Sequence, residues 1–115
     1  MKNRIVKVKP TPSNWETTCD KGLEVSVKYK LSEDGKACLR IKGQMDCELV
    51  DAIDGEVCVS APEAKGKNYG KVTIKASFEC KDTFEGSTIE YEVVLRNKRG
   101  DQVHKYESPA GYISC

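Results

Sequence analysis

Residues 23–31 read LEVSVKYKL, and apolar and polar side chains alternate strictly along this stretch. Successive side chains of an extended chain point to opposite sides, so the apolar ones share one face. These apolar positions are Leu23, Val25, Val27, Tyr29 and Leu31. A period of two with one polar face is typical of a strand that packs on a core in an antiparallel sheet. The stretch therefore predicts a half-buried antiparallel β-strand.

The same alternation returns at 72–80 (VTIKASFEC) and at 89–95 (IEYEVVL). Shorter candidate strands are 4–9, 37–42, 44–53, 56–61, 102–107 and 111–115. Turn-forming pairs fall between several of them, at Asp34-Gly35, Lys42-Gly43 and Asp54-Gly55. The pattern predicts an all-β fold, a single antiparallel β-sandwich (immunoglobulin-like or a small barrel) of about 7–9 short strands.

A chain of 115 residues is long enough for one domain, spanning 1–115. Pro10 and Pro12 favour an extended backbone, so residues 1–18 are expected to form an extended N-terminal lead-in. Trp15 precedes every cysteine, whereas an immunoglobulin domain proper has its tryptophan between the bridged pair. The domain is therefore expected to be sandwich-like without the immunoglobulin sequence signature.

Six cysteines are spread along the chain at unequal spacing: Cys19, Cys38, Cys47, Cys58, Cys80 and Cys115. Zinc sites usually contain closely spaced cysteine pairs, and no such pair occurs here, so no metal site is expected. Only 38% of the residues are hydrophobic, and a thin core favours cross-links that restrict the unfolded chain. The even number of cysteines therefore predicts three disulfides.

The sequence leaves the pairing of these cysteines open. A two-residue turn at Lys42-Gly43 would place Cys38 opposite Cys47, within bridging reach. Alternatively, Cys47 and Cys80 would each lie on the apolar face of a strand and join across the core. A bridge at Cys115 would pin the end of the chain.

Disulfides form in oxidising compartments, so the protein is predicted to be secreted. Its first residues, MKNRIVKVKP, lack the apolar core of a signal peptide, and the sequence is expected to be that of the mature chain. No apolar run approaches the length of a membrane span, so no membrane insertion is expected. The 19 basic and 18 acidic residues are interspersed without a basic stripe among aromatics, which argues against nucleic acid as a partner.

No arrangement of side chains indicates catalysis. His104 paired with a cysteine would need a free thiol, which the expected disulfides do not leave. Glu90 and Glu92 alternate with apolar residues on a predicted strand and are expected to be solvated there. The acidic residues around Asp54 lack the spacing of a calcium-binding EF-hand loop. The protein is therefore predicted to be non-enzymatic and to carry no cofactor.

Two exposed segments are candidate contact surfaces. The loop 62–70 contains Lys65, Lys67 and Tyr69, and tyrosine offers amphipathic contact area in protein-binding loops. If such a loop is braced, it could also act as the reactive loop of a protease inhibitor, with a lysine as the specificity residue.

The second segment is Arg99-Gly100-Asp101, the integrin-binding tripeptide RGD. It falls between two candidate strands, at 89–95 and 102–107. Gly100 fits a turn, so the tripeptide is expected to lie at a hairpin tip. An exposed, constrained tip is what an integrin ligand requires, and the same residues also form an ordinary polar turn.

Length, β-rich alternation and six spaced cysteines ending at Cys115 resemble the small secreted cysteine-rich effectors of fungi and other pathogens. The resemblance implies a stable extracellular scaffold, with a role in virulence, whose exposed loops bind a host protein or carbohydrate. It implies no catalytic residue. The leading hypothesis is thus a secreted, non-catalytic binding protein. The alternatives are an inhibitor of an extracellular hydrolase acting through loop 62–70, and an RGD-type adhesion module.

Overall fold

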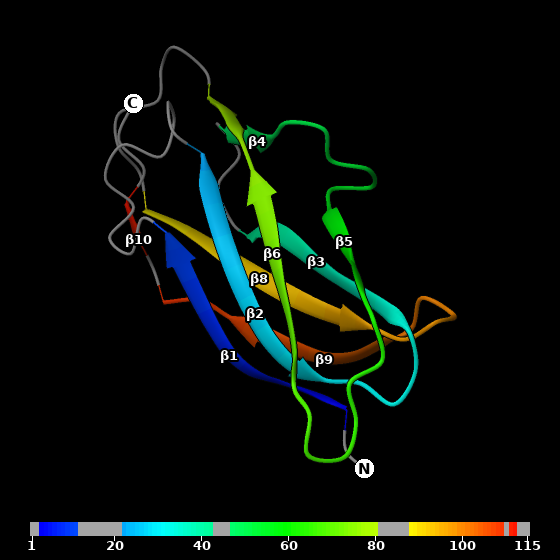
Figure 1. Cartoon of the computed structure of the whole chain (residues 1–115). Helices are drawn as coiled ribbons and strands as arrows, with labels where there is room; N and C mark the ends of the chain where they lie inside the picture. The colour runs from blue at the N-terminus through cyan, green and yellow to red at the C-terminus, as the bar shows by residue number, and fades with distance from the viewer. Residues whose placement is uncertain (1–2, 12–21, 43–46, 81–87, 110, 113–115) are drawn as a thin grey trace.

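The structure, a computed structural model, describes residues 3–11, 22–42, 47–80, 88–109 and 111–112 (Figure 1). The described residues form ten β-strands and no helix. The strands are β1 (Arg4–Thr11), β2 (Leu23–Lys30), β3 (Gly35–Lys42), β4 (Cys47–Leu49), β5 (Val57–Ala61), β6 (Gly70–Ala76), β7 (Phe78–Cys80), β8 (Thr88–Arg96), β9 (Gln102–Glu107) and β10 (Gly111–Tyr112). The all-β prediction is confirmed.

The strands pair antiparallel in every case and form two larger sheets and one small one. The first sheet has the order β1-β2-β6, the second the order β10-β8-β3-β5 with β9 also on β8, and β4 pairs with β7. The two larger sheets pack against each other around one core (Figure 1). β1 approaches β9 at one side, where the backbone N–H of Ile5 donates to Nδ1 of His104 at 2.9 Å.

The alternation that predicted β2 also decides what it buries. Leu23, Val25, Val27 and Tyr29 point into the core and are at most 1% exposed, while Glu24 and Ser26 between them face water. β6 behaves in the same way, with Ile74 buried. The core therefore lies between the inward faces of β2 and β6 on one side and those of β3 and β8 on the other.

β8 departs from the predicted alternation, since its residues 91–95 are all buried. Tyr91, Val93 and Leu95 face the core. On the outward face, side chains of the neighbouring strands β3 and β9 flank Glu92 and Val94. The expectation that Glu92 is solvated is wrong: it is 9% exposed, and its carboxylate lies 2.9 Å from Nε of Arg40. Glu90 is exposed as expected.

A disulfide joins Cys38 of β3 to Cys58 of β5, two positions that are directly paired in the sheet. The alternative that paired Cys38 with Cys47 is therefore wrong. In the described part of the chain β3 pairs with β5 and β8, and β4 pairs with β7. In that pair the backbones of Cys47 and Cys80 are opposite each other. The side chains of these two residues, and all of Cys19 and Cys115, lie outside the described residues.

The predicted positions of strands and turns agree with the structure in some segments and differ in others. The stretch 4–9 lies in β1, so part of the expected lead-in is a paired strand, and residues 12–18 lie outside the described residues. Of 44–53, the described strand residues are Cys47–Leu49. Asp54-Gly55 forms the predicted tight turn: Ile53 and Glu56 exchange two backbone hydrogen bonds across it, and both turn residues have positive φ, 53° and 79°.

Candidate binding site

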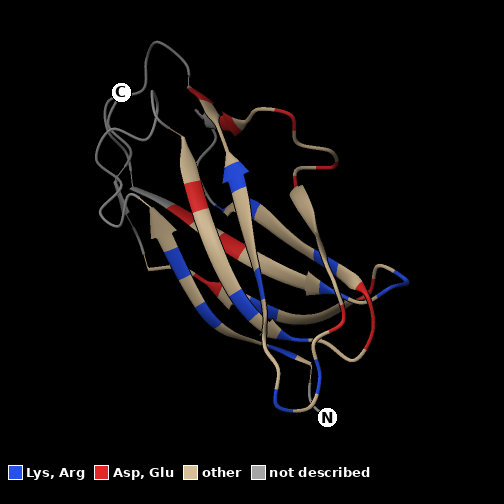
Figure 2. Ribbon diagram, viewed as in Figure 1, with Lys and Arg blue, Asp and Glu red and all other residues tan. Residues whose placement is uncertain are grey.

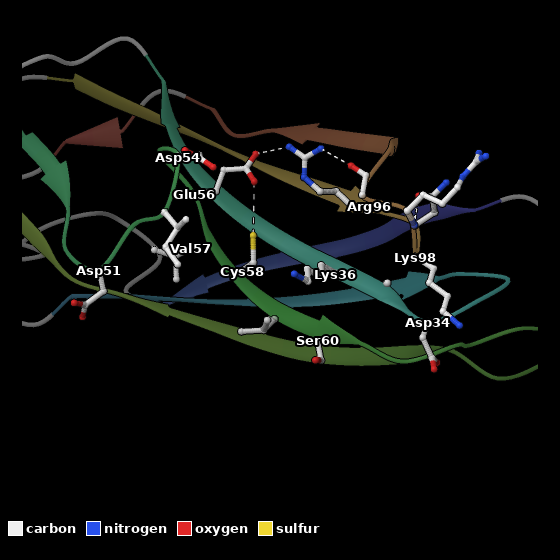
Figure 3. Close-up of a pocket in the computed structure, with 16 residues that line it drawn as sticks. Asp34, Lys36, Asp51, Asp54, Glu56, Val57, Cys58, Ser60, Arg96 and Lys98 are labelled. Atoms are coloured by element: carbon white, nitrogen blue, oxygen red, sulfur yellow. Dashed lines mark hydrogen bonds and ion pairs between the residues drawn. The ribbon is translucent and has the colours of Figure 1, made fainter.

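A groove of about 780 Å³ runs along β5, the last strand of its sheet in the described part of the chain (Figure 3). Four consecutive strand residues, 57–60, line it. Consecutive residues point to alternate faces of a strand, so a groove that touches all four follows the strand's edge. The Asp54-Gly55 turn closes one end of the groove, and the β8–β9 hairpin tip borders the other.

The register of β5 shows which of its backbone groups face the groove. The Cα atoms of Cys38 and Cys58 are 4.1 Å apart, the short separation of a pair that shares no ladder hydrogen bonds. The neighbouring positions Val57 and Val59 are then the ones bonded to β3. The N–H and C=O groups of Cys58 and Ser60 therefore point away from β3, along the open edge of the sheet.

A network of paired charges lies beside this edge, and Glu56 and Arg96 of the network line the groove. Glu56 forms an ion pair with Arg96 (Figure 3). It forms a second one, at 3.5 Å, with Arg40. Arg40 in turn holds Glu92 at 2.9 Å. The side chain of Glu56 is only 13% exposed, so the network is largely shielded from solvent. A partner that enters the groove meets the Glu56–Arg96 ion pair beside an open strand edge.

Glu56, Cys38 and Cys58 cluster closely enough to suggest metal ligands. The two sulfur atoms are bonded to each other, however, and a metal ion binds cysteine as the thiolate. In the disulfide form this cluster offers a single carboxylate, which is already paired with arginine. The cluster is therefore a structural cross-link.

The Arg99-Gly100-Asp101 tripeptide lies in the turn between β8 and β9, as the sequence predicted. Asn97 shapes this turn: its Oδ1 accepts hydrogen bonds from the backbone N–H groups of Arg99 and Asp101 at 3.1 and 2.9 Å. Gly100 has a φ of 90°, which suits glycine. The Arg99 and Asp101 side chains are 81% and 60% exposed, and they pair with each other at 3.1 Å instead of pointing apart. The adhesion hypothesis stays a prediction.

The loop 62–70 is anchored to the first sheet by Lys30, which is only 6% exposed. The Lys30 ammonium group donates to the backbone carbonyls of Gly66 and Asn68. It also lies 4.2 Å from the centre of the Tyr69 ring, a cation–π contact. The candidate contact residue Tyr69 therefore packs on a lysine while remaining 45% exposed.

Further hydrogen bonds fix the start of this loop. Leu31 and Ala64 exchange two backbone hydrogen bonds, and the Tyr29 hydroxyl donates to the carbonyl of Pro62 at 2.7 Å. Burial, and secondarily the charge of Asp34, raises the pKa of that hydroxyl above its ordinary value. The loop is held by Tyr29 and Lys30, and it presents Lys65 outward, 3.3 Å from Glu63.

The structure brings some of the predicted site residues together and separates others. Arg99 and Gly100 border the groove, whereas Lys65, Lys67 and Tyr69 lie on the neighbouring loop (Figure 1). The sequence interpretation missed the β5 edge and the anchoring role of Lys30. Alternation places Lys30 on the polar face of β2, and only the path of the distant loop buries it.

No model of a known protein family matches the chain, and no curated protein matches it significantly. Among the described residues, no helix is long and apolar enough to cross a membrane.

Proposed function

We propose that this protein is a secreted binding protein that takes an extended segment of an extracellular protein onto the open edge of β5. The observation that carries the proposal is the set of outward backbone groups at Cys58 and Ser60, in a groove of about 780 Å³. An added strand would complete the ladder with main-chain hydrogen bonds, the mode known as β-augmentation. Open edges invite such pairing, and natural proteins usually cover them.

The proposed scaffold is an immunoglobulin-like sandwich with three disulfides. The strand orders β1-β2-β6 and β5-β3-β8-β9 support this, because they form two antiparallel sheets that pack face to face around one core. The Cys38–Cys58 bridge supports an oxidising, extracellular location. This location agrees with the resemblance to secreted effectors, and a count of free thiols in the native protein tests it.

The substitution Ser60→Pro tests the proposed binding mode. Proline removes the backbone N–H that points into the groove, while the ladder with β3 uses Val57 and Val59. The immobilised protein is incubated with host extracellular fluid, and retained proteins are quantified by mass spectrometry. Ser60→Pro is expected to retain at least about tenfold less of the specific partner than the parent.

Ser60→Ala is the matched control, because it removes the side chain and keeps the N–H. It should retain the same proteins as the parent. A folded Ser60→Pro variant that captures those proteins in parental amounts would contradict β-augmentation. Circular dichroism melts of all three proteins establish that they are folded.

The rigid anchoring of loop 62–70 favours a second candidate function, inhibition of an extracellular protease. Inhibitor loops must hold their backbone against cleavage, and Lys30 together with Tyr29 supplies such bracing here. Lys65 or Lys67 would then enter the specificity pocket of the protease. A panel of trypsin-like proteases is expected to be inhibited by the parent and at least about tenfold less by the Lys65→Ala, Lys67→Ala variant. No inhibition by the parent removes this candidate.

A further inference from the structure

The outer face of the sheet β1-β2-β6 carries a row of lysines that crosses all three strands. Lys7 is paired with Lys28, and Lys28 is paired with Lys71 on its other side. Lys9 lies on the same face of β1, two residues from Lys7. Figure 2 shows these basic segments on β1, β2 and β6. Strands are about 4.8 Å apart, so the row spans roughly 10 Å.

The surface between these lysines is hollowed. A shallow depression of about 420 Å³ is lined by Lys7, Lys9, Lys28 and Lys71, with Ser26 and Thr73 contributing hydroxyl groups and Val27 and Val72 completing the lining. The two hydroxyl oxygens are 3.5 Å apart on neighbouring strands. The depression therefore presents ammonium groups around two hydroxyl groups that can also donate hydrogen bonds.

The charge of this face is not compensated within the described residues. The described carboxylate on this face is that of Glu24, at the far end of the sheet. It lies 3.8 Å from the ammonium group of Lys75. The second sheet differs, since Arg40 and Lys42 on its outer face each pair with a carboxylate, at 2.9 and 3.0 Å. Like charges directly opposite each other on a sheet are destabilising.

We propose that this face binds a linear sulfated polysaccharide. Closely spaced lysines make point-charge contacts with sulfate and carboxylate groups, and a polyanion would relieve the repulsion between Lys7, Lys28 and Lys71. Sulfated polysaccharides are polyanions of the extracellular space, the location proposed for this protein. The binding surface itself is separate from the β5 groove, which lies on the other sheet.

The same surface fits nucleic acid and membranes less well. Single-stranded bases stack on exposed aromatic rings, and the ring of Tyr69 beside this face is occupied by the ammonium groups of Lys28 and Lys30, at 4.5 and 4.2 Å. Binding within a membrane interface needs large apolar side chains among the basic ones. Among the described residues, the exposed large apolar side chains are Val6, Ile53 and Tyr69, and none of them lines the depression.

Heparin serves as the probe, with affinity measured at several salt concentrations. The parent is expected to bind heparin at about 0.1 M salt. The double variant Lys7→Gln, Lys71→Gln is expected to bind heparin at least about tenfold more weakly. The slope of log affinity against log salt should fall by about one for each lysine removed. Desulfated heparin should bind the parent weakly.

The matched control is the double variant Lys36→Gln, Lys98→Gln, which removes the same net charge from the β5 groove on the second sheet. This control, and also Ser60→Pro, should keep heparin affinity within about twofold of the parent. Equal losses in both double-lysine variants, or no binding of heparin by the parent, would overturn the proposal. Tighter binding to duplex DNA or to phosphatidylserine vesicles than to heparin would also overturn it. Because Ser60→Pro tests only the groove, failure of either proposal leaves the other intact.

Discussion

Gly70→Ala is expected to destabilise the protein by about 3 kcal/mol, at the upper end of the range for overpacked cores. A Cβ atom at Gly70 would lie 2.3 Å from Cζ of Tyr29 and 2.6 Å from its Cε1. Gly70 is paired with Tyr29 across the β2–β6 ladder, and the ring packs directly over the glycine. The ring has little room to move, because it is 1% exposed and its hydroxyl is bonded to Pro62. Urea and thermal unfolding measure the loss.

A double-mutant cycle with Tyr29→Ala separates this clash from other effects of the substitution. Tyr29→Ala alone should cost about 3–5 kcal/mol, as expected when a large buried ring is truncated. It also removes the atoms that the new methyl group meets. The double variant should therefore be more stable than the sum of the two losses predicts, by about 2 kcal/mol. Strict additivity would mean that the Tyr29 ring is not what makes alanine unfavourable at position 70.

Removing the Cys38–Cys58 disulfide should have an effect of similar size. The bridge closes a loop with a sequence separation of 20 residues, for which the loss of unfolded-chain entropy is worth about 3 kcal/mol. The variant Cys38→Ala, Cys58→Ala is therefore expected to melt roughly 10 °C below the parent. Thermal unfolding without reductant measures the difference. A melting temperature unchanged within about 2 °C would show that the bridge contributes little.

Alkylation of the native protein, followed by mass measurement, accompanies this experiment. The Cys38–Cys58 bridge accounts for two of the cysteines, and the proposed scaffold predicts that none of the six reacts. Six reactive thiols would contradict both the bridge and the extracellular location. Peptide mapping identifies the remaining partners, including whether Cys47 and Cys80, whose backbones are paired, are joined.

Periodicity in the sequence was sufficient to predict which residues of β2 and β6 face the core. Side-chain direction in a strand depends only on position, so Val25 and Ile74 could be placed inside without knowledge of any partner strand. The tip formed by Arg99 and Gly100 was predictable for a related reason, since a turn of this kind depends on neighbouring residues.

The partners of each strand depend on long-range packing, and here local patterns failed. Cys38 pairs with Cys58 because β5 returns beside β3 after an excursion that includes β4. The lysine row brings together residues from three strands, and each lysine alone is an ordinary polar position of its own strand. Lys30 is similar, since its burial depends on carbonyl groups of Gly66 and Asn68. Such contacts become visible only when the register is known.

The face-to-face packing of the two sheets also determines how the molecule would be oriented at a surface. Their outer faces point in opposite directions, and the uncompensated lysines lie on the first sheet (Figure 2). A molecule resting on a polyanionic matrix by β1, β2 and β6 would turn its second sheet toward the surrounding fluid. The hairpin tip at Arg99 would then stay accessible while the protein is immobilised. A single small domain could in this way display its β5 groove from a fixed support.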